Sequence, residues 1–265
     1  MKETIKKIAP NWLWDFAKHT ITKSRLKKII KWSDDISVRD NGIIFLSDLC
    51  GEGKAWRGWE EYHSQFMQDY YIDTFCFKGM ENGFFCDIGG NSPIWINNTY
   101  FFEEKRGWTG IAFDPLPDKK AKWAECRKTV CEQLALGKEN GKLVFKEYEH
   151  DFMSGFASSA DYDGEVRNQY EVDVRPLKEV LREKSIKHID FVSLDVEGSE
   201  YEVLCGIDFS EVDISVFVIE NNDDNRKSRR KLLQKNGYHL QAILWSDEVW
   251  VKNDFDFKKD LVSAE

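Results

Sequence analysis

The sequence predicts an α/β domain built on a doubly wound, mostly parallel sheet. Apolar, β-branched segments alternate with helical segments from residue 83 to residue 236, which is the pattern of βαβ units with helices on both faces of a sheet. The 265 residues are 42% hydrophobic and include ten tryptophans, so the chain can bury a substantial core and is not of the disordered class. This length suits one α/β domain, or one domain with an appendage.

Residues 1–32 are expected to form two short helices, because apolar side chains from Ile5 to Phe16 recur at spacings of three and four. The segment carries nine Lys or Arg against two acidic residues, a net charge of +7 that leaves −16 on the rest of the chain. Basic helices with aromatic residues can lie at an anionic membrane surface or dock on an assembly enzyme. The alternative, which we favour, is a helical cap that packs on the body or on another subunit.

The remaining elements follow from the spacing of apolar residues and from Gly, Pro and Asn at the boundaries. Before the alternating part we expect a short strand over 40–49, a Gly-rich loop over 51–58 and a helix over 59–77. Next come a strand over 83–88, a helix over roughly 94–105, a strand over 109–114, a helix over 117–127 and strands near 129–135 and 142–148. After a polar stretch over 150–173 we expect a helix over 175–184, a strand over 189–195, a short helix, a strand over 214–220, a helix over 226–236 and two final strands.

Composition limits the partners and the compartment. The acidic body disfavours nucleic acid as a partner. No apolar run approaches the ~20 residues needed to span a bilayer, and the N-terminus lacks the pattern of a signal peptide. We therefore expect a cytoplasmic protein, with the inner face of the membrane as the place of any peripheral contact. The six cysteines form no CxxC pair, which indicates reduced thiols rather than a zinc site.

The first strand of the alternating part ends in a Gly-rich loop. Asp87 is followed by Ile88, Gly89, Gly90 and Asn91. Glycines at this point let the backbone pass close to a ligand, and Asp87 or a neighbouring carbonyl could accept a hydrogen bond from an ammonium group. The loop lacks the GxGxxG pattern of pyrophosphate binders.

The second strand ends at Asp114, 25 residues beyond Gly89. An acidic residue at this place typically accepts hydrogen bonds from both hydroxyls of a ribose. The alternative is an N-cap for the next helix, which Pro115 and Pro117 would suit. Together with the Gly-rich loop, the spacing favours the ribose.

Two later strands also end on carboxylates. The segment IDFVSLDVEGSEYE (189–202) supplies Asp195 and Glu197, and the strand over 214–220 ends in Glu220 and Asn221. If these strands are neighbours, Asp195, Glu220 and Asn221 offer the oxygen ligands that Mg²⁺ or a similar cation prefers. A cation placed there could lower the pKa of a substrate hydroxyl. Glu200, by contrast, is expected to be solvated in the first turn of a helix.

At these residues the chain resembles the FkbM-type S-adenosylmethionine-dependent methyltransferases. The resemblance covers roughly residues 64–253, and the DVEGSE segment is its most specific part. The segments that carry it are SQFMQDYYID (64–73), GFFCDIGGN (83–91), NNTYFFEEKRGWTGIAFDP (97–115), SGFASS (154–159), IDFVSLDVEGSEYEVLCGID (189–208), VIENN (218–222) and GYHLQAILWSDEVWVKN (237–253).

The resemblance implies the class I methyltransferase fold, a Rossmann-like sheet of seven strands whose last hairpin adds an antiparallel strand. It implies S-adenosylmethionine as the cofactor and methyl transfer to a hydroxyl of a sugar, glycan or secondary metabolite. The residues expected to bind the cofactor are Asp87, Gly89, Gly90, Asn91, Asn98, Asp114, Ala135 and Asp195. Asp87 to Asn91 would hold its methionine part and Asp114 its ribose.

For the chemistry, Asp195 is expected to orient and activate the acceptor hydroxyl, with Glu197 and Glu220 as further catalytic candidates. Asp195, Glu220 and Asn221 stand where metal-dependent O-methyltransferases of this fold place their ligands, so Mg²⁺ or another divalent cation is a candidate cofactor. Aromatic residues near 95–108 suit stacking on sugar faces, although a buried core is the commoner use of such residues.

The chain departs from the family pattern at Ser92 and Pro93. Proline removes a backbone donor and fixes φ, which leaves open a non-catalytic nucleotide-binding protein of the same fold. A second alternative is an NAD(P)-dependent oxidoreductase that uses Asp114 for the ribose. We expect three parts: a basic helical extension over 1–63, a methyltransferase domain over 64–256 and a tail over 257–265.

Overall fold

The computed structural model describes residues 61–148, 155–156, 166–221, 225–244 and 246–256. The chain divides into two compact units, Met1–Ile43 and Ile44–Glu265, and the first lies wholly outside the described residues. The predicted elements before residue 59, the boundary near residue 63 and the C-terminal tail therefore stay predictions. Within the described ranges, no helix is both long and apolar enough to cross a membrane.

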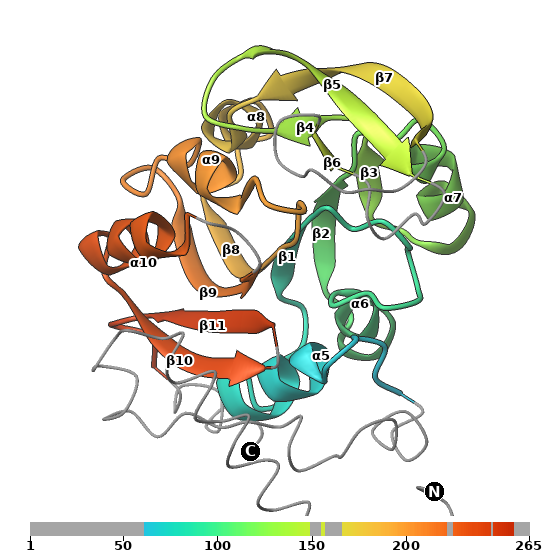
Figure 1. The fold of residues 1–265 in the computed structure, drawn as a ribbon. Coiled ribbons are helices and arrows are strands. Elements are labelled where there is room, and N and C mark those ends of the chain that lie inside the picture. The colour runs from blue at the N-terminus through green and yellow to red at the C-terminus, as the bar shows by residue number, and fades with distance from the viewer. Residues whose placement is uncertain (1–60, 149–154, 157–165, 222–224, 245, 257–265) are drawn as a thin grey trace, which may run out of the picture. The chain divides into compact units, whose positions relative to one another are not determined.

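The central sheet has seven strands (Figure 1). They are β1 (Phe84–Ile88), β2 (Thr109–Phe113), β3 (Val130–Glu132), β8 (His188–Leu194), β9 (Asp213–Glu220), β10 (Tyr238–Leu244) and β11 (Asp247–Lys252). They lie in the order β10-β11-β9-β8-β1-β2-β3. All neighbours are parallel except β11, which runs antiparallel to both β9 and β10. The predicted seven-stranded, mostly parallel sheet with an antiparallel strand from the last hairpin is confirmed.

Helices cover both faces of this sheet, as the sequence predicts for a doubly wound fold (Figure 1). On one face lie α5 (Gln68–Tyr71), its continuation as the π-helix η2 (Ile72–Cys76), α6 (Tyr100–Arg106) and α7 (Lys119–Cys126). On the other face lie α8 (Leu177–Glu183), α9 (Glu200–Cys205) and α10 (Arg226–Lys235).

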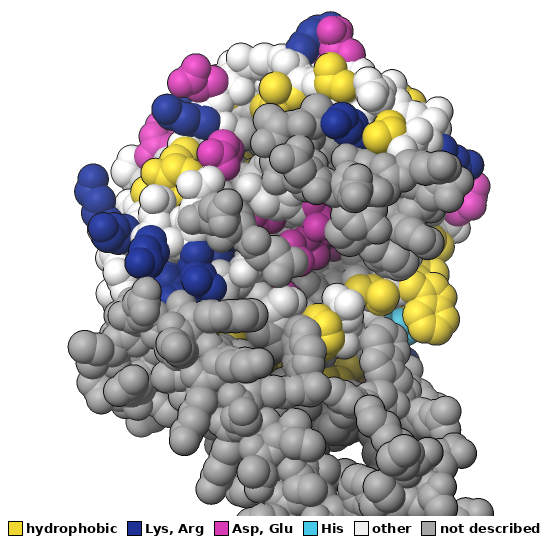
Figure 2. Space-filling model, in the orientation of Figure 1, with side chains coloured by type: hydrophobic (Ala, Val, Ile, Leu, Met, Phe, Trp, Pro, Cys, Tyr) yellow, Lys and Arg dark blue, Asp and Glu magenta, His cyan; other side chains and the backbone are white. Residues whose placement is uncertain are grey.

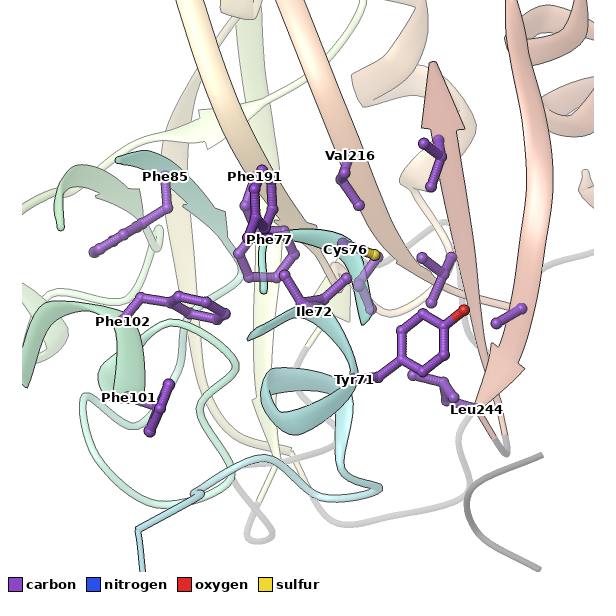
Figure 3. Packing of buried hydrophobic residues seen from close by; sticks show 14 of the residues in the cluster. Tyr71, Ile72, Cys76, Phe77, Phe85, Phe101, Phe102, Phe191, Val216 and Leu244 are labelled. Carbon is purple, nitrogen blue, oxygen red and sulfur yellow. The ribbon is translucent and has the colours of Figure 1, made fainter. Parts of the chain in front are cut away.

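The core beneath α5, η2 and α6 is largely aromatic (Figure 3). The strand register places Phe85, Phe191 and Val216 side by side on one face, and these side chains pack with Phe77 and Phe102 in one buried cluster. Burying an aromatic side chain removes 150–250 Å² from water, so this cluster fixes β1 and β8 in the middle of the sheet. The strand ends that carry the polar residues are thereby held rigidly.

A second sheet of four strands was not expected. It consists of β4 (Ala135–Leu136), β5 (Gly141–Tyr148), β6 (Gly155–Phe156) and β7 (Val166–Arg175), in the order β4-β7-β5-β6. Most of β7 falls in the stretch 150–173 that the sequence analysis left without an element, so that expectation was wrong. Its buried residues Val172 and Val174 pack with Phe145 of β5. The predicted strand near 129–135 is two short strands, β3 and β4, in different sheets.

Two predicted helices begin later than expected. The helix predicted over 59–77 begins at Gln68, because Met67 has a left-handed φ of 64° that helical residues do not adopt. The helix predicted over 94–105 begins at Tyr100, because Ile96 has a left-handed φ of 52°. The loop between β1 and α6 is therefore longer than predicted, and it forms one wall of the site described next.

Candidate functional site

A pocket of about 430 Å³ opens at the carboxyl ends of β1, β2, β8 and β9. Small-molecule sites usually enclose roughly 300–1,000 Å³, so a nucleoside-sized ligand fits this space. Figure 2 shows acidic side chains in a hollow of this face. All eight predicted cofactor positions line the pocket: Asp87, Gly89, Gly90, Asn91, Asn98, Asp114, Ala135 and Asp195. The predicted catalytic residues Glu197 and Glu220 also line the pocket. The functional roles assigned to the eight cofactor positions and to these two residues stay predictions.

Gly89 brings the loops after β1 and β8 into direct contact. Its φ is +83°, and a Cβ at this position would lie 1.7 Å from the carbonyl oxygen of Asp195. The Gly89 N–H donates to the carbonyl of Phe113 at 2.9 Å, and the Asp195 N–H donates to the carbonyl of Ile88 at 3.0 Å. Any larger side chain would separate the strand ends, so glycine is required here by packing as well as by backbone conformation.

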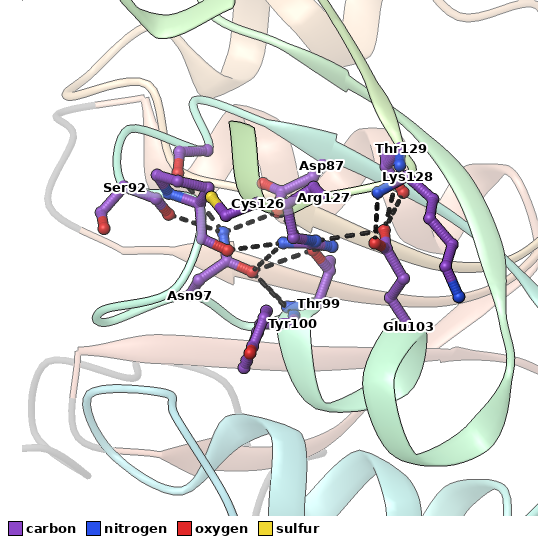
Figure 4. Close-up of polar contacts among 12 residues, drawn as sticks. Asp87, Ser92, Asn97, Thr99, Tyr100, Glu103, Cys126, Arg127, Lys128 and Thr129 are labelled. Carbon is purple, nitrogen blue, oxygen red and sulfur yellow. Dashed lines mark hydrogen bonds and ion pairs between the residues drawn. The ribbon is translucent and has the colours of Figure 1, made fainter. Parts of the chain in front are cut away.

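Asp87 organises the loop that follows it (Figure 4). Its Oδ2 accepts hydrogen bonds from Thr99 Oγ1 at 2.6 Å and from Asn97 Nδ2 at 3.1 Å. Burial raises the pKa of the Asp87 carboxyl, while these hydrogen bonds and the charge of Arg127 oppose that rise. The predicted contact of Asp87 with an ammonium group stays a prediction.

The Asn97 side chain forms hydrogen bonds with several backbone groups of the same loop. The side chain is buried, and its Nδ2 also donates to the carbonyls of Gly90 at 3.3 Å and Ser92 at 3.1 Å. Its Oδ1 accepts from the backbone N–H of Tyr100 at 2.8 Å, which satisfies a donor at the start of α6. Sequence reasoning missed Asn97, although an Asn shortly before a helix is a recognisable cap signal.

Arg127 is a second residue that sequence reasoning missed. Its Nη1 donates to the carbonyl of Pro93 at 2.7 Å, and its Nε lies 3.1 Å from Glu103 Oε2. The guanidinium carbon lies 4.5 Å from the ring centroid of Trp123, which adds a cation–π contact. Pro93 is therefore anchored behind the loop and does not line the pocket. Nothing in the local sequence reveals these long-range partners.

Asp114 lies at the end of β2 with both oxygens engaged by backbone. Oδ2 accepts from the N–H of Asn91 at 3.1 Å, and Oδ1 accepts from the N–H of Leu116 at 2.9 Å. Burial raises the pKa of Asp114 to about 6. The alternative role as N-cap of the next helix is wrong, because α7 begins at Lys119 with Asp118 at the N-cap position. Each Asp114 oxygen retains a lone pair for a ligand.

Three carboxylates meet at the ends of β8 and β9. One oxygen each of Asp195, Glu197 and Glu220 lies within 4.8 Å of the others. Asp195 is open to the pocket but closely surrounded by protein on its other sides, and this burial together with the charge of Glu197 raises its pKa well above the usual value. Burial and the neighbouring Asp195 raise the pKa of Glu220, with which Asp195 shares a hydrogen bond. Burial and the charge of Glu200 raise the pKa of Glu197 to about 7.

The backbone around Glu197 is held in an unusual conformation by Glu200. Glu197 has a left-handed φ of 53°. Glu200 Oε1 accepts from the N–H groups of Val196 at 3.0 Å and Gly198 at 3.1 Å. Glu200 is fully buried, so the expectation that it is a solvated helix residue was wrong. Its hydrogen bonds fix the backbone on both sides of Glu197.

Asn221 follows Glu220 but is engaged elsewhere. Its Oδ1 accepts a hydrogen bond from Arg229 Nη2 at 2.5 Å, and it does not line the pocket. Its role as a metal ligand stays a prediction. Asp247, at the start of β11, lies behind the site, where its charge contributes to the raised pKa of Asp195. Gln68 Nε2 donates to Asp247 Oδ2 at 2.5 Å.

Comparison with known proteins identifies the family of this chain. A family model described as the methyltransferase FkbM domain matches residues 87–240. None of the curated proteins compared with the chain matches it. One solved structure, described as that of a ribosomal RNA methyltransferase from Plasmodium falciparum, is similar over 73% of this chain and 98% of that one, with 14% identity and a TM-score of 0.35. A similarity at that level says nothing about the substrate.

Proposed function

Because this chain belongs to the FkbM methyltransferase family, we propose that it transfers the methyl group of S-adenosylmethionine to a hydroxyl of a sugar or glycan-type acceptor. The family match covers residues 87–240, more than half of the chain, and makes the protein an S-adenosylmethionine-dependent methyltransferase. The specific part of the proposal is the hydroxyl of a carbohydrate. The observation that carries it is one pocket that unites the cofactor positions with three carboxylates at the adjoining strand ends.

The residues present fit the cofactor. Gly89 and Gly90 line the pocket at the end of β1, where the methionine part would lie, and the remaining lone pairs of Asp114 suit ribose hydroxyls. Leu116, Ala135 and Phe145 add an apolar wall suited to a flat base. The cofactor supplies a methyl group bonded to a positively charged sulfur.

Asp195 is the proposed general base. It lies at the carboxyl end of β8, lines the pocket and is open to it. A carboxylate with a raised pKa is a better proton acceptor for a hydroxyl than an ordinary one. In this proposal Asp195 orients the acceptor oxygen in line with the departing sulfur and takes its proton as the oxygen attacks. Glu197 and Glu220 assist by holding the proton within the cluster.

A divalent cation at the same carboxylates is the alternative form of the proposal, in which Asp195 is a ligand rather than the general base. Asp195, Glu197 and Glu220 present oxygens within 4.8 Å of one another, and clustered carboxylates are the ligands that hard cations prefer. A cation held there would bind the acceptor hydroxyl and lower its pKa. Glu197 therefore joins Asp195 and Glu220 in the proposed set, and the role of Asn221 stays a prediction.

Titration with S-adenosylhomocysteine by calorimetry tests the cofactor part of the proposal without knowledge of the acceptor. We expect saturable one-to-one binding to the full chain in magnesium-containing buffer, and at least ten-fold weaker binding by Asp114→Ala. Asn140→Ala is the matched control, since Asn140 is exposed and bonded to Glu179 away from the pocket. No binding by the unaltered chain would favour the non-catalytic alternative, and binding of NADH instead would favour an oxidoreductase.

As a subsidiary hypothesis beside the favoured helical cap, we also propose that residues 1–32 bring the enzyme to an anionic membrane surface or to an assembly complex. The net charge of +7 on this segment, against −16 on the rest, supports the proposal. The segment lies outside the described residues, so the test uses the full chain. Flotation with anionic liposomes at low salt is expected to carry the protein upward, and absence of flotation would contradict a membrane role.

A further inference from the structure

Trp95 is exposed to solvent and also lines the wall of the pocket. It is the most exposed large hydrophobic side chain among the described residues, with 68% of its surface accessible, and it lines the pocket. The apolar side chains of Phe113, Leu116 and Phe145, which also line the wall, are buried. Trp95 therefore marks the open side of the pocket, where an acceptor has to enter while the cofactor occupies the interior.

The loop that carries Trp95 is fixed on both sides. The Trp95 N–H donates to Ser92 Oγ at 3.1 Å, and Arg127 holds the carbonyl of Pro93 at 2.7 Å. The next residue, Ile96, has a left-handed φ of 52°, a conformation that a β-branched residue adopts only when its surroundings impose it. Asn97 is buried and ties the loop to Gly90 and Asp87. These contacts hold the loop in the conformation that leaves Trp95 exposed.

The chemistry around Trp95 selects the kind of ring that can bind. An indole offers a flat apolar face with negative charge density, which matches the C–H face of a pyranose ring. Asp195 and Glu197 line the same pocket as Trp95 and offer carboxylate acceptors for the hydroxyls on the rim of such a ring. Nucleotides also stack their bases on aromatic side chains, but their phosphates would meet an acidic pocket in a chain of net charge −9.

We infer that Trp95 is a specificity-determining residue, which stacks against the apolar face of an uncharged pyranose ring and directs one of its hydroxyls into the pocket. This inference rests on the proposed function and adds the residue that selects its acceptor. It assigns recognition of the ring to the β1–α6 loop.

Fluorine NMR on the full chain labelled with 5-fluorotryptophan tests the inference. Trp95→Phe removes one resonance and so identifies the Trp95 signal. With S-adenosylhomocysteine at saturation, the methyl pyranosides of glucose, galactose and mannose are titrated in turn, followed by uridine monophosphate. We expect at least one pyranoside to shift the Trp95 signal saturably and the nucleotide to leave it unchanged.

Variants separate stacking from a structural effect. Trp95→Ala is expected to weaken pyranoside binding at least ten-fold, measured by saturation transfer to the sugar, while S-adenosylhomocysteine affinity stays the same. Trp95→Phe is expected to retain most of the binding. Phe75→Ala is the matched control, because Phe75 is also an exposed aromatic residue but does not line the pocket; it is expected to change neither affinity.

The failures are distinguishable. If S-adenosylhomocysteine binds but no methyl pyranoside shifts the Trp95 signal, the inference is overturned and the cofactor part of the proposed function stands. A shift with uridine monophosphate alone also overturns it. If S-adenosylhomocysteine does not bind to the unaltered chain, the proposed function fails and the inference falls with it.

Discussion

Asp114 has both carboxylate oxygens bonded to backbone N–H groups at the end of β2, and burial raises its pKa to about 6. The raised pKa means that the folded state binds this proton more tightly than the unfolded state does. The resulting stabilisation is fully present below the unfolded pKa of 3.8 and is lost as the pH rises through about 6. In the proposed function, the ionised form is the one that accepts hydrogen bonds from two ribose hydroxyls. Ligand affinity and stability thus depend on pH in opposite directions.

We therefore predict that S-adenosylhomocysteine binds about ten-fold more tightly at pH 7 than at pH 5, since ionisation near pH 6 changes the carboxylate population by that factor. Calorimetry across this range measures it, with the Asp114→Asn variant as the control that cannot ionise. The variant is expected to bind weakly at both values. Equal affinity of the unaltered chain at pH 5 and pH 7 would contradict the role of Asp114.

A second single-residue prediction concerns Asn97. Removing its buried amide leaves the carboxylate of Asp87 and the carbonyls of Gly90 and Ser92 with fewer donors, and each unsatisfied buried group costs about 1–3 kcal/mol. Asn97→Ala is predicted to lower the free energy of unfolding by about 2–4 kcal/mol in urea. Asn140→Ala, at an exposed hydrogen-bonded Asn, is predicted to change it by less than about 0.5 kcal/mol.

At the scale of elements, a buried ion pair joins α10 to β11. Arg230 Nε lies 2.9 Å from Glu248 Oε1, and Trp250 Nε1 donates to Glu248 Oε2 at 3.0 Å. Glu248 is fully buried, so its charge depends on these partners and on Arg229, whose Nη2 lies 3.8 Å from Oε2. The pair fixes the helix that also holds Asn221, next to the catalytic candidate Glu220.

Arg230→Met is predicted to destabilise the protein by about 3–5 kcal/mol, because it leaves the buried carboxylate of Glu248 undercompensated. The double variant Arg230→Met with Glu248→Met is predicted to be less destabilised than the single one. Lys231→Met, at an exposed position of the same helix, is the control and is expected to be near neutral. Thermal or urea unfolding measures all three, and a double variant worse than Arg230→Met would contradict the account.

The elements also show what the sequence could and could not predict. The strand ends at Asp87, Asp114 and Asp195 were predictable, since each follows an apolar run and parallel strands share one carboxyl edge. Strand β7 was missed, although Tyr170, Val172 and Val174 alternate with polar residues; the first four residues of β7 are exposed and carry no such signal. The contacts of Arg127 could not be predicted, because they join residues brought together only by folding.

At the scale of the whole molecule, a cation would link two parts of the sheet. Asp195 and Glu197 follow β8, and Glu220 ends β9, so three carboxylates from two strands repel one another in the absence of a counter-charge. A ligand that binds only the folded state stabilises it by about 2.7 kcal/mol at one hundred times its dissociation constant. The folding stability of the chain thus becomes a measure of metal binding.

We predict that millimolar Mg²⁺ or Mn²⁺ raises the melting temperature relative to EDTA, and that Asp195→Asn abolishes most of this rise. Electron paramagnetic resonance of Mn²⁺ provides a readout that does not require activity. Asp208→Asn is the control, as Asp208 is an acidic residue outside the pocket. Identical melting temperatures with Mn²⁺ and EDTA, together with an unchanged Mn²⁺ spectrum, would remove the cation from the proposal.

The contact between Gly89 and the Asp195 carbonyl has a consequence for how this enzyme can be redesigned. Only a hydrogen atom separates the two loops at that point, so Gly89 cannot be enlarged without displacing the backbone of Asp195. Position 89 is therefore closed to engineering. New acceptor preferences have to be introduced elsewhere in the pocket wall, as at Trp95, which is exposed and can be replaced by a smaller aromatic side chain without moving the strand ends.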